Sequence, residues 1–448
     1  MNKNITIKKL KLYISEINSL LRATNQEVSD SIILGMVFIQ FIDIMKQRNI
    51  FDINKHIKGD LLLNKVGSDD EYEAKVEEFI KVNNGLEELI GDVIKPIRLC
   101  GEEDVLTSRL RGYNSEIYDY DGDLAELFEE AIYFVNKREN ITPISISKLI
   151  AALLSNVEAK EIYDGVVGSG SLLTEVAKNR KEINVFGQDI NSDSLKICKM
   201  NLILNGKFES VKNIKQGNTI TDPAFVDENN KVCTYDIVVS DIPMGVRDYG
   251  FMVIQEDKYN RFRRGIPSKL NADYAFITHM VESIDENGIG ILVVPSGTLF
   301  RAGMEGKIRK AFIQENIIDC VISLPSNMLY RTRVSVNLLI FKKNRKADDI
   351  LFIDASNKGK VKQRIAQLDD DSIEDIKSLY DKREDVDEFS KNIALDKIKE
   401  NDVNLAVSKY VYKEKRKKLD FEELSLEAKQ LSEKLYDIGK ELDSKFRN

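Results

Sequence analysis

Two short apolar segments, about seventy residues apart, constrain the fold most strongly because each ends in residues suited to a ligand. The first is Ile162-Tyr-Asp-Gly-Val-Val-Gly-Ser-Gly170 and the second is Tyr235-Asp-Ile-Val-Val-Ser-Asp-Ile-Pro-Met-Gly245. Each apolar run predicts a buried strand of a parallel sheet. Ligands of open α/β sheets bind at the carboxyl ends of parallel strands, so we expect both segments to border one crevice.

The first segment is typical of a cofactor-binding loop. Gly168 and Gly170 let the backbone turn sharply and approach a ligand, while Asp164 at the strand end can accept a hydrogen bond. The next predicted strand, 185–190, ends in Asp189, nineteen residues past Gly170. At about this spacing a Rossmann-like sheet places a carboxylate that binds ribose hydroxyls. A polar turn follows at Gly217-Asn-Thr219.

The second segment is typical of a reaction loop, because Asp241 and Pro243 follow the end of its predicted strand. The order of glycine loop, acidic strand end, polar turn and Asp-Ile-Pro-Met resembles the S-adenosylmethionine-dependent methyltransferases that modify the exocyclic amine of adenine in DNA. A plainer interpretation, in which Asp189 and Asp241 only cap a helix or turn, does not explain why both stand at successive strand ends.

The chain further resembles the modification (M) subunit of type I restriction-modification systems. The resemblance runs from about residue 10 to the C-terminus, is densest over 160–356 and is faint in the first 130 residues. The matching segments are Phe186-Gly-Gln-Asp-Ile-Asn191, Met200-Asn-Leu-Ile-Leu-Asn-Gly206, Thr221-Asp-Pro-Ala-Phe225, Asn271-Ala-Asp-Tyr-Ala-Phe276, Val294-Pro295, Leu299-Phe-Arg301, Glu305-Gly-Lys-Ile-Arg309 and Phe352-Ile-Asp-Ala-Ser356.

This resemblance implies a class I S-adenosylmethionine-dependent methyltransferase fold, with a Rossmann-like, mostly parallel sheet. It implies S-adenosyl-L-methionine as the cofactor, bound by Thr142, Pro143, Asp164, Gly168, Ser169, Gly170, Asp189, Ile190 and Asn218. The catalytic residues that it implies are Asp241, Ile242, Pro243 and Met244. No metal site is expected.

The chemistry explains why these residue types matter. The adenine amine is a poor nucleophile because its lone pair is delocalised into the ring. Enzymes of this class flip the base out, stack it on an aromatic ring and accept both amine hydrogens on a side-chain oxygen and a backbone carbonyl. Asp241 and the carbonyl of Ile242 can supply these acceptors. Met244 replaces the usual aromatic, and stacking is worth about 1–3 kcal/mol per base.

Other positions depart from the family pattern. Gly165 stands where the family has proline, Asn218 where an aspartate is usual, Ile242 where the first proline of the catalytic motif is usual, and Ile141 where an aromatic precedes Thr-Pro. The cofactor residues are kept better than the catalytic ones. Two hypotheses therefore stay open: an active DNA adenine-N6 methyltransferase, or a catalytically weakened relative acting as an assembly or DNA-binding component. A methyltransferase for a different amine also remains open.

The net charge of −8 argues against a chain that grips DNA alone. One local basic patch combines cations with Tyr249, Phe251 and Phe262, a mixture suited to phosphates and unstacked bases. A solvated loop with core aromatics is the alternative, because acidic residues dilute the patch. One of the three aromatics is a candidate for the stacking role that Met244 lacks. The predicted DNA-binding residues are Arg247, Arg261, Arg263, Arg264 and Lys269.

Proline and glycine indicate the domain boundaries. Six of the seven prolines and fourteen of the 24 glycines fall between residues 136 and 346. We therefore expect a helical N-terminal domain (1–135), a methyltransferase domain (136–346) and a C-terminal extension (347–448). Helical patterns occur near 5–22, 31–45 and 72–91, and further strands are predicted at 290–294, 317–323 and 335–341.

The chain ends in a seam typical of a coiled-coil-like helix at about 420–445, formed by Phe421, Leu424, Ala428, Leu431, Leu435, Ile438 and Leu442. The resemblance implies that this helix lies near the specificity (S) subunit, in a hetero-oligomer that also includes the restriction (R) subunit in some assemblies. DNA is the implied substrate. Widely spaced cysteines, no signal peptide and no membrane-length apolar run predict a cytoplasmic protein.

Overall fold

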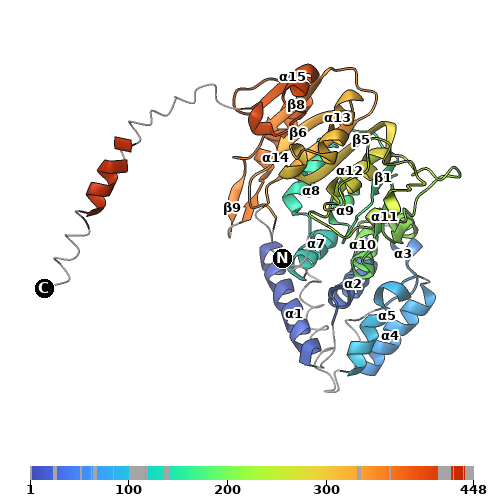
Figure 1. Cartoon of the computed structure of the whole chain (residues 1–448). Coiled ribbons are helices and arrows are strands. Elements are labelled where there is room, and N and C mark those ends of the chain that lie inside the picture. Colours follow the sequence, from blue (N-terminus) through green and yellow to red (C-terminus); the bar gives the residue numbers. More distant parts are fainter. Residues whose placement is uncertain are drawn as a thin grey trace.

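The computed structural model describes residues 3–23, 28–50, 53–61, 63, 68–83, 85–99, 117, 120–135, 141–329, 334–362, 365–411, 425–426, 428–436 and 438. A helical region and an α/β region lie side by side, with the helices of the first region at one end of the molecule (Figure 1). Within these described residues, no helix is long and apolar enough to cross a membrane.

The helical region is built around α2 (Asp30–Gln47), which is apolar on nearly all sides because other helices surround it. It packs against α5 (Glu87–Leu99), α7 (Leu124–Val135) and α10 (Ser192–Leu204). The region also contains α1 (Lys3–Ala23), α3 (Ile53–His56) and α4 (Asp69–Val82). The predicted helices near 5–22 and 31–45 are confirmed as α1 and α2. The pattern at 72–91 is two helices, α4 and α5, with a break after Val82.

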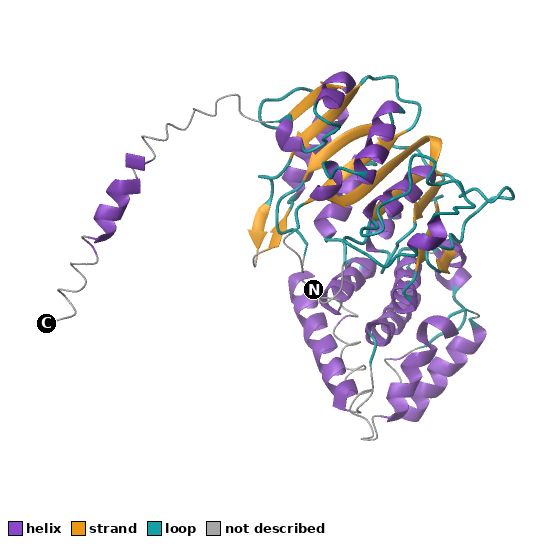
Figure 2. Ribbon diagram, in the orientation of Figure 1, coloured by secondary structure: helices purple, strands orange, loops and turns teal. Residues whose placement is uncertain are grey.

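The α/β region contains a nine-stranded sheet in the order β11-β8-β6-β7-β5-β4-β1-β2-β3 (Figure 2). All neighbouring strands are parallel except β7, which is antiparallel to β5 and β6, and β11, which is antiparallel to β8. The expected mostly parallel sheet is confirmed. The strands are β1 (Glu161–Asp164), β2 (Asn184–Asp189), β3 (Ile214–Gln216), β4 (Tyr235–Asp241), β5 (Ile284–Pro295), β6 (Ile318–Ser323), β7 (Val336–Lys342), β8 (Asp349–Asp354) and β11 (Ser390–Ala394).

Helices cover both faces of this sheet, which explains why its strands read as continuous apolar runs. On β4, Ile237 and Val239 join the core under one layer, whereas Val238 joins the core under the other. The first layer is formed by α8 (Ile144–Leu153), α9 (Ser171–Ala177), α10 and α14 (Asp370–Lys382); the second by α12 (Asp273–Glu282), α13 (Met304–Gln314) and α15 (Leu395–Glu400). A separate hairpin joins β9 (Lys360–Lys362) to β10 (Ile365–Gln367).

The helix α10 joins the two regions. Met200 and Ile203 enter the core of the helical region, whereas Cys198 and Leu202 enter the core beneath the sheet. Ion pairs from Lys196 to Asp92 and from Lys199 to Glu88 reinforce this contact.

The two domain limits expected from the sequence fall after residues 135 and 346. Residues 136–140, where the first limit falls, lie outside the described residues. The sheet continues past the second expected limit at 346, because β8 pairs with β6 and β11 pairs with β8. The α/β unit therefore extends to at least residue 394. The charged sequence between these two strands hid this extension.

The C-terminal segment is helical at 425–426, 428–436 and 438. Three seam residues there, Leu431, Leu435 and Ile438, are more than half exposed. Ala428 of the seam is exposed as well, whereas the seam positions Phe421, Leu424 and Leu442 lie outside the described residues.

Candidate active site

The strand order creates a crevice between β1 and β4. From β1 the chain proceeds through β2 and β3 toward one edge, whereas β4 and β5 continue the sheet on the other side. Such a switch point is the usual ligand site of an open α/β sheet. A cavity of about 760 Å³ lies there. Its lining includes Thr142, Asp164, Gly168, Ser169, Asp189, Ile190, Asn218, Asp241, Ile242, Pro243, Met244, Tyr249, Asp273, Phe276 and Arg301.

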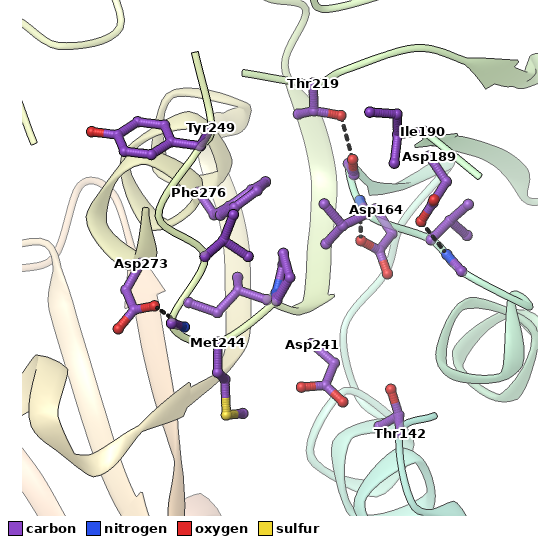
Figure 3. A pocket seen from close by; sticks show the side chains of 18 of the residues that line it. Thr142, Asp164, Asp189, Ile190, Thr219, Asp241, Met244, Tyr249, Asp273 and Phe276 are labelled. Carbon is purple, nitrogen blue, oxygen red and sulfur yellow. Dashed lines mark hydrogen bonds between the residues drawn. The ribbon is translucent and has the colours of Figure 1, made fainter. Parts of the chain in front are cut away.

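The two predicted segments thus meet in one cavity. Figure 3 shows Asp164, Asp189 and Thr219 on one side of it, with Met244, Asp273 and Phe276 on the other. Asp241 lies between the two groups and faces Thr142. We call the first side the cofactor half and the second side, with Asp241, the acceptor half.

Asp164 ends β1 and is almost fully buried. Its Oδ1 accepts hydrogen bonds from the backbone N–H of Val166 (2.9 Å) and the hydroxyl of Ser240 (2.9 Å). Burial raises its pKa to about 7, although both hydrogen bonds act against this shift and the charges of Asp189 and Asp241 add to it. A ligand that donates a hydrogen bond or carries positive charge would therefore stabilise the charged form of this buried carboxylate.

The glycine loop passes close to neighbouring atoms. Gly170 has φ +79°, and a Cβ atom there would lie 2.7 Å from the Sγ of Cys198. Gly168 has φ +54°, and its position opens into space. Gly168 therefore leaves the backbone bare where the loop borders the cavity, whereas Gly170 makes room for Cys198 and is not one of the lining residues. The helix α9 begins directly after Gly170.

Asp189 ends β2 and fixes the glycine loop. Its Oδ2 accepts from the N–H of Gly168 (2.9 Å), and its Oδ1 accepts from the N–H of Asn191 (2.9 Å). Each carboxylate oxygen keeps a second lone pair for a ligand. Beside it, the side chain of Ile190 is 67% exposed and lines the cavity, so it offers an apolar surface to a flat ring.

Two further predicted residues border this half. The Oδ1 of Asn218 accepts from the N–H groups of Ile220 (2.9 Å) and Thr221 (3.3 Å), so the amide oxygen stabilises the turn after β3. Thr142 lines the cavity from a segment before α8, whereas Pro143 is the residue that precedes this helix. Tyr133 of α7 holds this segment by donating its hydroxyl to the carbonyl of Thr142.

The acceptor half starts at Asp241, the last residue of β4. Desolvation raises the pKa of Asp241 to about 6, and a hydrogen bond from Thr142 opposes this rise. Ile242 is buried, whereas Pro243 and Met244 are partly exposed to the cavity. Above its pKa, Asp241 therefore presents an acceptor oxygen at the centre of the cavity.

Asp273 and Arg301 hold the backbone after this motif, a role that the sequence did not assign to them. Asp273 is buried, accepts from the N–H of Gly245 (3.1 Å) and forms an ion pair with Arg301. Arg301 also pairs with Glu305 at 2.8 Å. The segments 271–276 and 299–301 were noticed only for their resemblance, and that match was the available signal for a role at the site.

The predicted DNA-binding set divides in two. Arg247 and Lys269 are exposed. The prediction for Arg261 is wrong, because its side chain is 1% exposed and binds internal groups. Arg264 is also unavailable at the surface, since its side chain is 2% exposed and pairs with Glu282 and Glu315. Arg263 is exposed but pairs with the same two glutamates.

Two of the three aromatic candidates for stacking are largely buried. Tyr249 lines the cavity, but its hydroxyl donates to the carbonyl of Ser268 at 2.8 Å. Phe262 is 5% exposed and belongs to the core. Among the residues that the structure describes, no group of three or more His, Cys, Asp or Glu side chains is placed to hold a metal ion.

The cavity fits an adenosyl cofactor that carries a sulfonium charge. Its cofactor half offers a bare glycine backbone, an exposed isoleucine and two carboxylates, Asp164 and Asp189. These groups suit a purine ring, ribose hydroxyls and a cationic ligand. Asp241 then lies beyond this half, where a second substrate can enter.

Comparison with known proteins agrees with this geometry. A family model described as N-6 DNA Methylase matches residues 131–419, more than half of the chain. The type I restriction enzyme MpnII methylase subunit of Mycoplasma pneumoniae is 31% identical over 326 residues, which cover 69% of this chain and 59% of that protein. The MjaVII methylase subunit of Methanocaldococcus jannaschii is 30% identical over 384 residues, covering 79% and 65%. The chain spans about three fifths of the length of these curated relatives.

Solved structures share the fold at lower identity. A type I restriction-modification methyltransferase subunit from Streptococcus thermophilus has a TM-score of 0.72 at 23% identity, covering 90% of this chain and 99% of that one. A modification subunit of a type I restriction enzyme from Vibrio vulnificus has a TM-score of 0.60 at 14% identity, covering 88% and 93%.

Proposed function

This chain belongs to the N-6 DNA methylase family, and from that premise we propose that it is the modification subunit of a type I restriction-modification system. Its proposed reaction transfers a methyl group from S-adenosylmethionine to the exocyclic amine of adenine in DNA. The observation that carries the proposal is the convergence of Asp164, Asp189 and Asp241 on one cavity at the switch point of the sheet.

In the cofactor half, this chain's residues bind and orient. Asp189 accepts hydrogen bonds from ribose hydroxyls, and Ile190 packs on the adenine ring. Gly168, Ser169 and Gly170 allow close approach of the backbone, and Asp164 balances positive charge. When bound, S-adenosylmethionine supplies an electrophilic methyl group and a neutral thioether leaving group.

In the acceptor half, Asp241 and the backbone carbonyl of Ile242 accept the two hydrogens of the adenine amine. This arrangement draws the nitrogen lone pair out of the ring and aims it at the methyl carbon. S-adenosylmethionine bound in the cofactor half would supply the methyl group to this nitrogen, and the amine would release one proton. Asp241 is a carboxylate above about pH 6 and lies where it can take that proton.

Asp273 and Arg301 support this half without touching the reacting atoms. The Gly245 N–H donates to Asp273, so the backbone after the Asp241-Ile-Pro-Met244 motif keeps one path. Met244 contacts the flipped base through its thioether, a weaker surface than an aromatic ring. Of the five predicted DNA-binding residues, Arg247 and Lys269 are exposed and available to meet DNA phosphates.

Sequence recognition and assembly are assigned to partners. With a net charge of −8, the chain relies on a specificity subunit to grip and read DNA. The exposed seam residues Leu431, Leu435 and Ile438 provide an apolar surface for that hetero-oligomer. A restriction subunit joins the complete system, and the complex acts in the cytoplasm.

A second candidate is a catalytically weakened relative that binds cofactor and assembles on DNA. It is favoured by Ile242 and Met244, which depart from the family at the acceptor, while Asp164, Gly168 and Asp189 of the cofactor half are kept. A methyltransferase for a different amine is the third candidate, because the missing aromatic removes a feature specific to a flipped base.

Calorimetric titration with S-adenosylmethionine tests the proposal first. The Asp189→Ala variant should weaken binding at least about tenfold, since it removes an acceptor of ribose hydroxyls and releases Gly168. Glu182→Ala is the matched control, because Glu182 is exposed just before the same strand. Absence of binding by the folded wild-type chain would contradict every methyltransferase candidate.

Methyl transfer to unmodified DNA, with the specificity subunit co-expressed, then separates the candidates. Labelled N6-methyladenine in the product supports the first candidate. Cofactor binding without methylated DNA supports the weakened relative, and label on another base or on protein supports the third.

A further inference from the structure

Arg261, which the sequence suggested for DNA, is one of the largest fully buried side chains of the described structure. Its guanidinium donates to the carbonyls of Thr219 (3.0 Å) and Ile220 (2.7 Å), in the turn that follows β3. The same group pairs with Asp257 at 2.7 Å, which is buried as well. A charge so placed is paired and fully hydrogen-bonded, as burial requires.

The hydrogen bonds continue through His279 to β1. Arginine has donors only, so the Nδ1 of His279, 3.2 Å from Nη1 of Arg261, must accept. Its Nε2 then carries the hydrogen and donates to the hydroxyl of Tyr163 at 2.9 Å. Burial and the Arg261 charge lower the pKa of His279, in keeping with this neutral form.

Both ends of this network support the cofactor half. Thr219 donates its hydroxyl to the carbonyl of Gly165, which joins the β3 turn to the loop after Asp164. A Cβ atom on Gly165 would lie 2.8 Å from the hydroxyl oxygen of Tyr163 and 2.7 Å from the Cε of Met280. Gly165 and the hydroxyl of Tyr163 therefore fit together closely beneath the loop.

We propose that Arg261 is a positioning residue of the adenosyl-cofactor site, fixing the turn at 218–220 against the loop at 164–168 through Thr219, Ile220 and His279. The inference rests on the proposed function and adds a residue that lies outside the cavity lining. It also explains how a loop with Gly165, in place of a stiffer residue, keeps its conformation. Arg261 acts through the backbone carbonyls of Thr219 and Ile220 and not through contact with a ligand.

Arginine is suited to this role by its shape. The planar fork reaches two adjacent carbonyls, an aspartate and an imidazole at once. An ammonium group keeps the charge but is a compact centre with three donors on a flexible stem. With three donors for four partner groups, Arg261→Lys therefore leaves at least one of these groups without its donor and loosens the network that holds the turn.

The test compares Arg261→Lys with Arg345→Lys. Arg345 is also buried, donates to two carbonyls, of Ile318 and Asp349 (each 2.6 Å), and pairs with Asp319, all away from the cavity. The dissociation constant of S-adenosylhomocysteine is measured by calorimetry, well below each variant's melting temperature. We expect both variants to lose thermal stability, but only Arg261→Lys to bind at least about tenfold more weakly.

The inference is overturned, and the proposed function is not, if folded Arg261→Lys binds S-adenosylhomocysteine within about twofold of wild type. The same holds if Arg345→Lys loses as much affinity as Arg261→Lys. Absence of binding by the wild-type chain overturns the inference and the proposed function together. If Arg261→Lys does not fold, Asp257→Asn, which removes the paired charge, takes its place. A loss of at least about threefold for Asp257→Asn supports the inference, and an unchanged dissociation constant contradicts it.

Discussion

The two halves of the cavity are stabilised in different ways. In the cofactor half, Asp164 and Asp189 accept hydrogen bonds from backbone N–H groups of Val166, Gly168 and Asn191, which belong to the turns that carry the two aspartates. In the acceptor half, Asp241 faces Thr142, about a hundred residues earlier in the chain.

The same contrast holds for the residues after the catalytic motif. Gly245 is held by Asp273, which is held in turn by Arg301. Backbone donors do not change when side chains change, so the hydrogen bonds from Val166, Gly168 and Asn191 persist when side chains nearby are substituted. The acceptor half depends on side chains from several segments, and all of them must be present for it to keep its shape. The departures from the family motifs fall in both halves, with Ile242 and Met244 in the acceptor half and Gly165 and Asn218 in the cofactor half.

The strongest test of this separation is Asp241→Ala. We expect methyl transfer to fall by about 10²–10³-fold, because the amine loses its side-chain acceptor. The dissociation constant of S-adenosylhomocysteine should change by less than about threefold. Asp241→Asn keeps an acceptor oxygen and should retain far more activity than the alanine variant. A parallel loss of cofactor affinity in Asp241→Ala would show that the halves are not separable.

The reverse test is Gly170→Ala, which should weaken cofactor affinity by about tenfold. Its left-handed φ of +79° costs a non-glycine residue about 1–2 kcal/mol, and the new Cβ meets Cys198 at 2.7 Å. Gly206→Ala is the matched control, because Gly206 has φ +72° with open space around it. The control should lose stability in urea unfolding but keep the affinity measured by calorimetry.

The pH dependence of kcat sharpens the comparison. Asp241 has a raised pKa of about 6, so it is protonated as pH falls through that value. The neutral carboxyl accepts hydrogen bonds more weakly and can no longer take the proton of the amine. At pH 5, kcat should therefore be about tenfold lower than at pH 7.5. Saturating cofactor is needed, because the pKa of Asp164, about 7, affects cofactor binding in the same range. If kcat of Asp241→Asn still falls at low pH, another titrating group causes that fall.

The smallest effect is expected from Met244→Phe. A phenyl ring should lower the KM for DNA by less than about tenfold, since stacking is worth about 1–3 kcal/mol and the thioether already supplies part of it. Met252→Phe serves as the control, because Met252 is 70% exposed on α11 (Phe251–Ile254) and does not line the cavity. An unchanged KM for Met244→Phe would place base stacking elsewhere, with Tyr249 the next residue to vary.

The sequence predicted the central strands and the positions of Asp164 and Asp189 at their ends, because both depend on local patterns. The apolar runs of these strands are visible in the sequence itself. The strands β8 and β11 are not evident in the sequence because their short runs stand among charged residues. Only the pairing of β8 with β6 and of β11 with β8 reveals them.

Arg261 shows what a local pattern cannot convey. Arginines interleaved with aromatic residues are typical of a nucleic-acid surface, yet burial depends on the three-dimensional packing of Thr219, Asp257 and His279 around the side chain. The same limit applies to Asp273 and Arg301. Asp273 lies 28 residues after its partner Gly245 and 28 residues before its partner Arg301. No spacing rule connects these residues to the catalytic motif.

The place of β7 in the sheet has a consequence for biosynthesis. This strand lies between β5 and β6, although the ribosome makes it after both. Until residues 336–342 emerge, β5 and β6 each lack their shared neighbour and expose unpaired backbone groups. Such open strand edges invite pairing with other nascent chains. Translation speed and chaperone supply between residues 324 and 342 are therefore determinants of how much of this protein reaches its folded state.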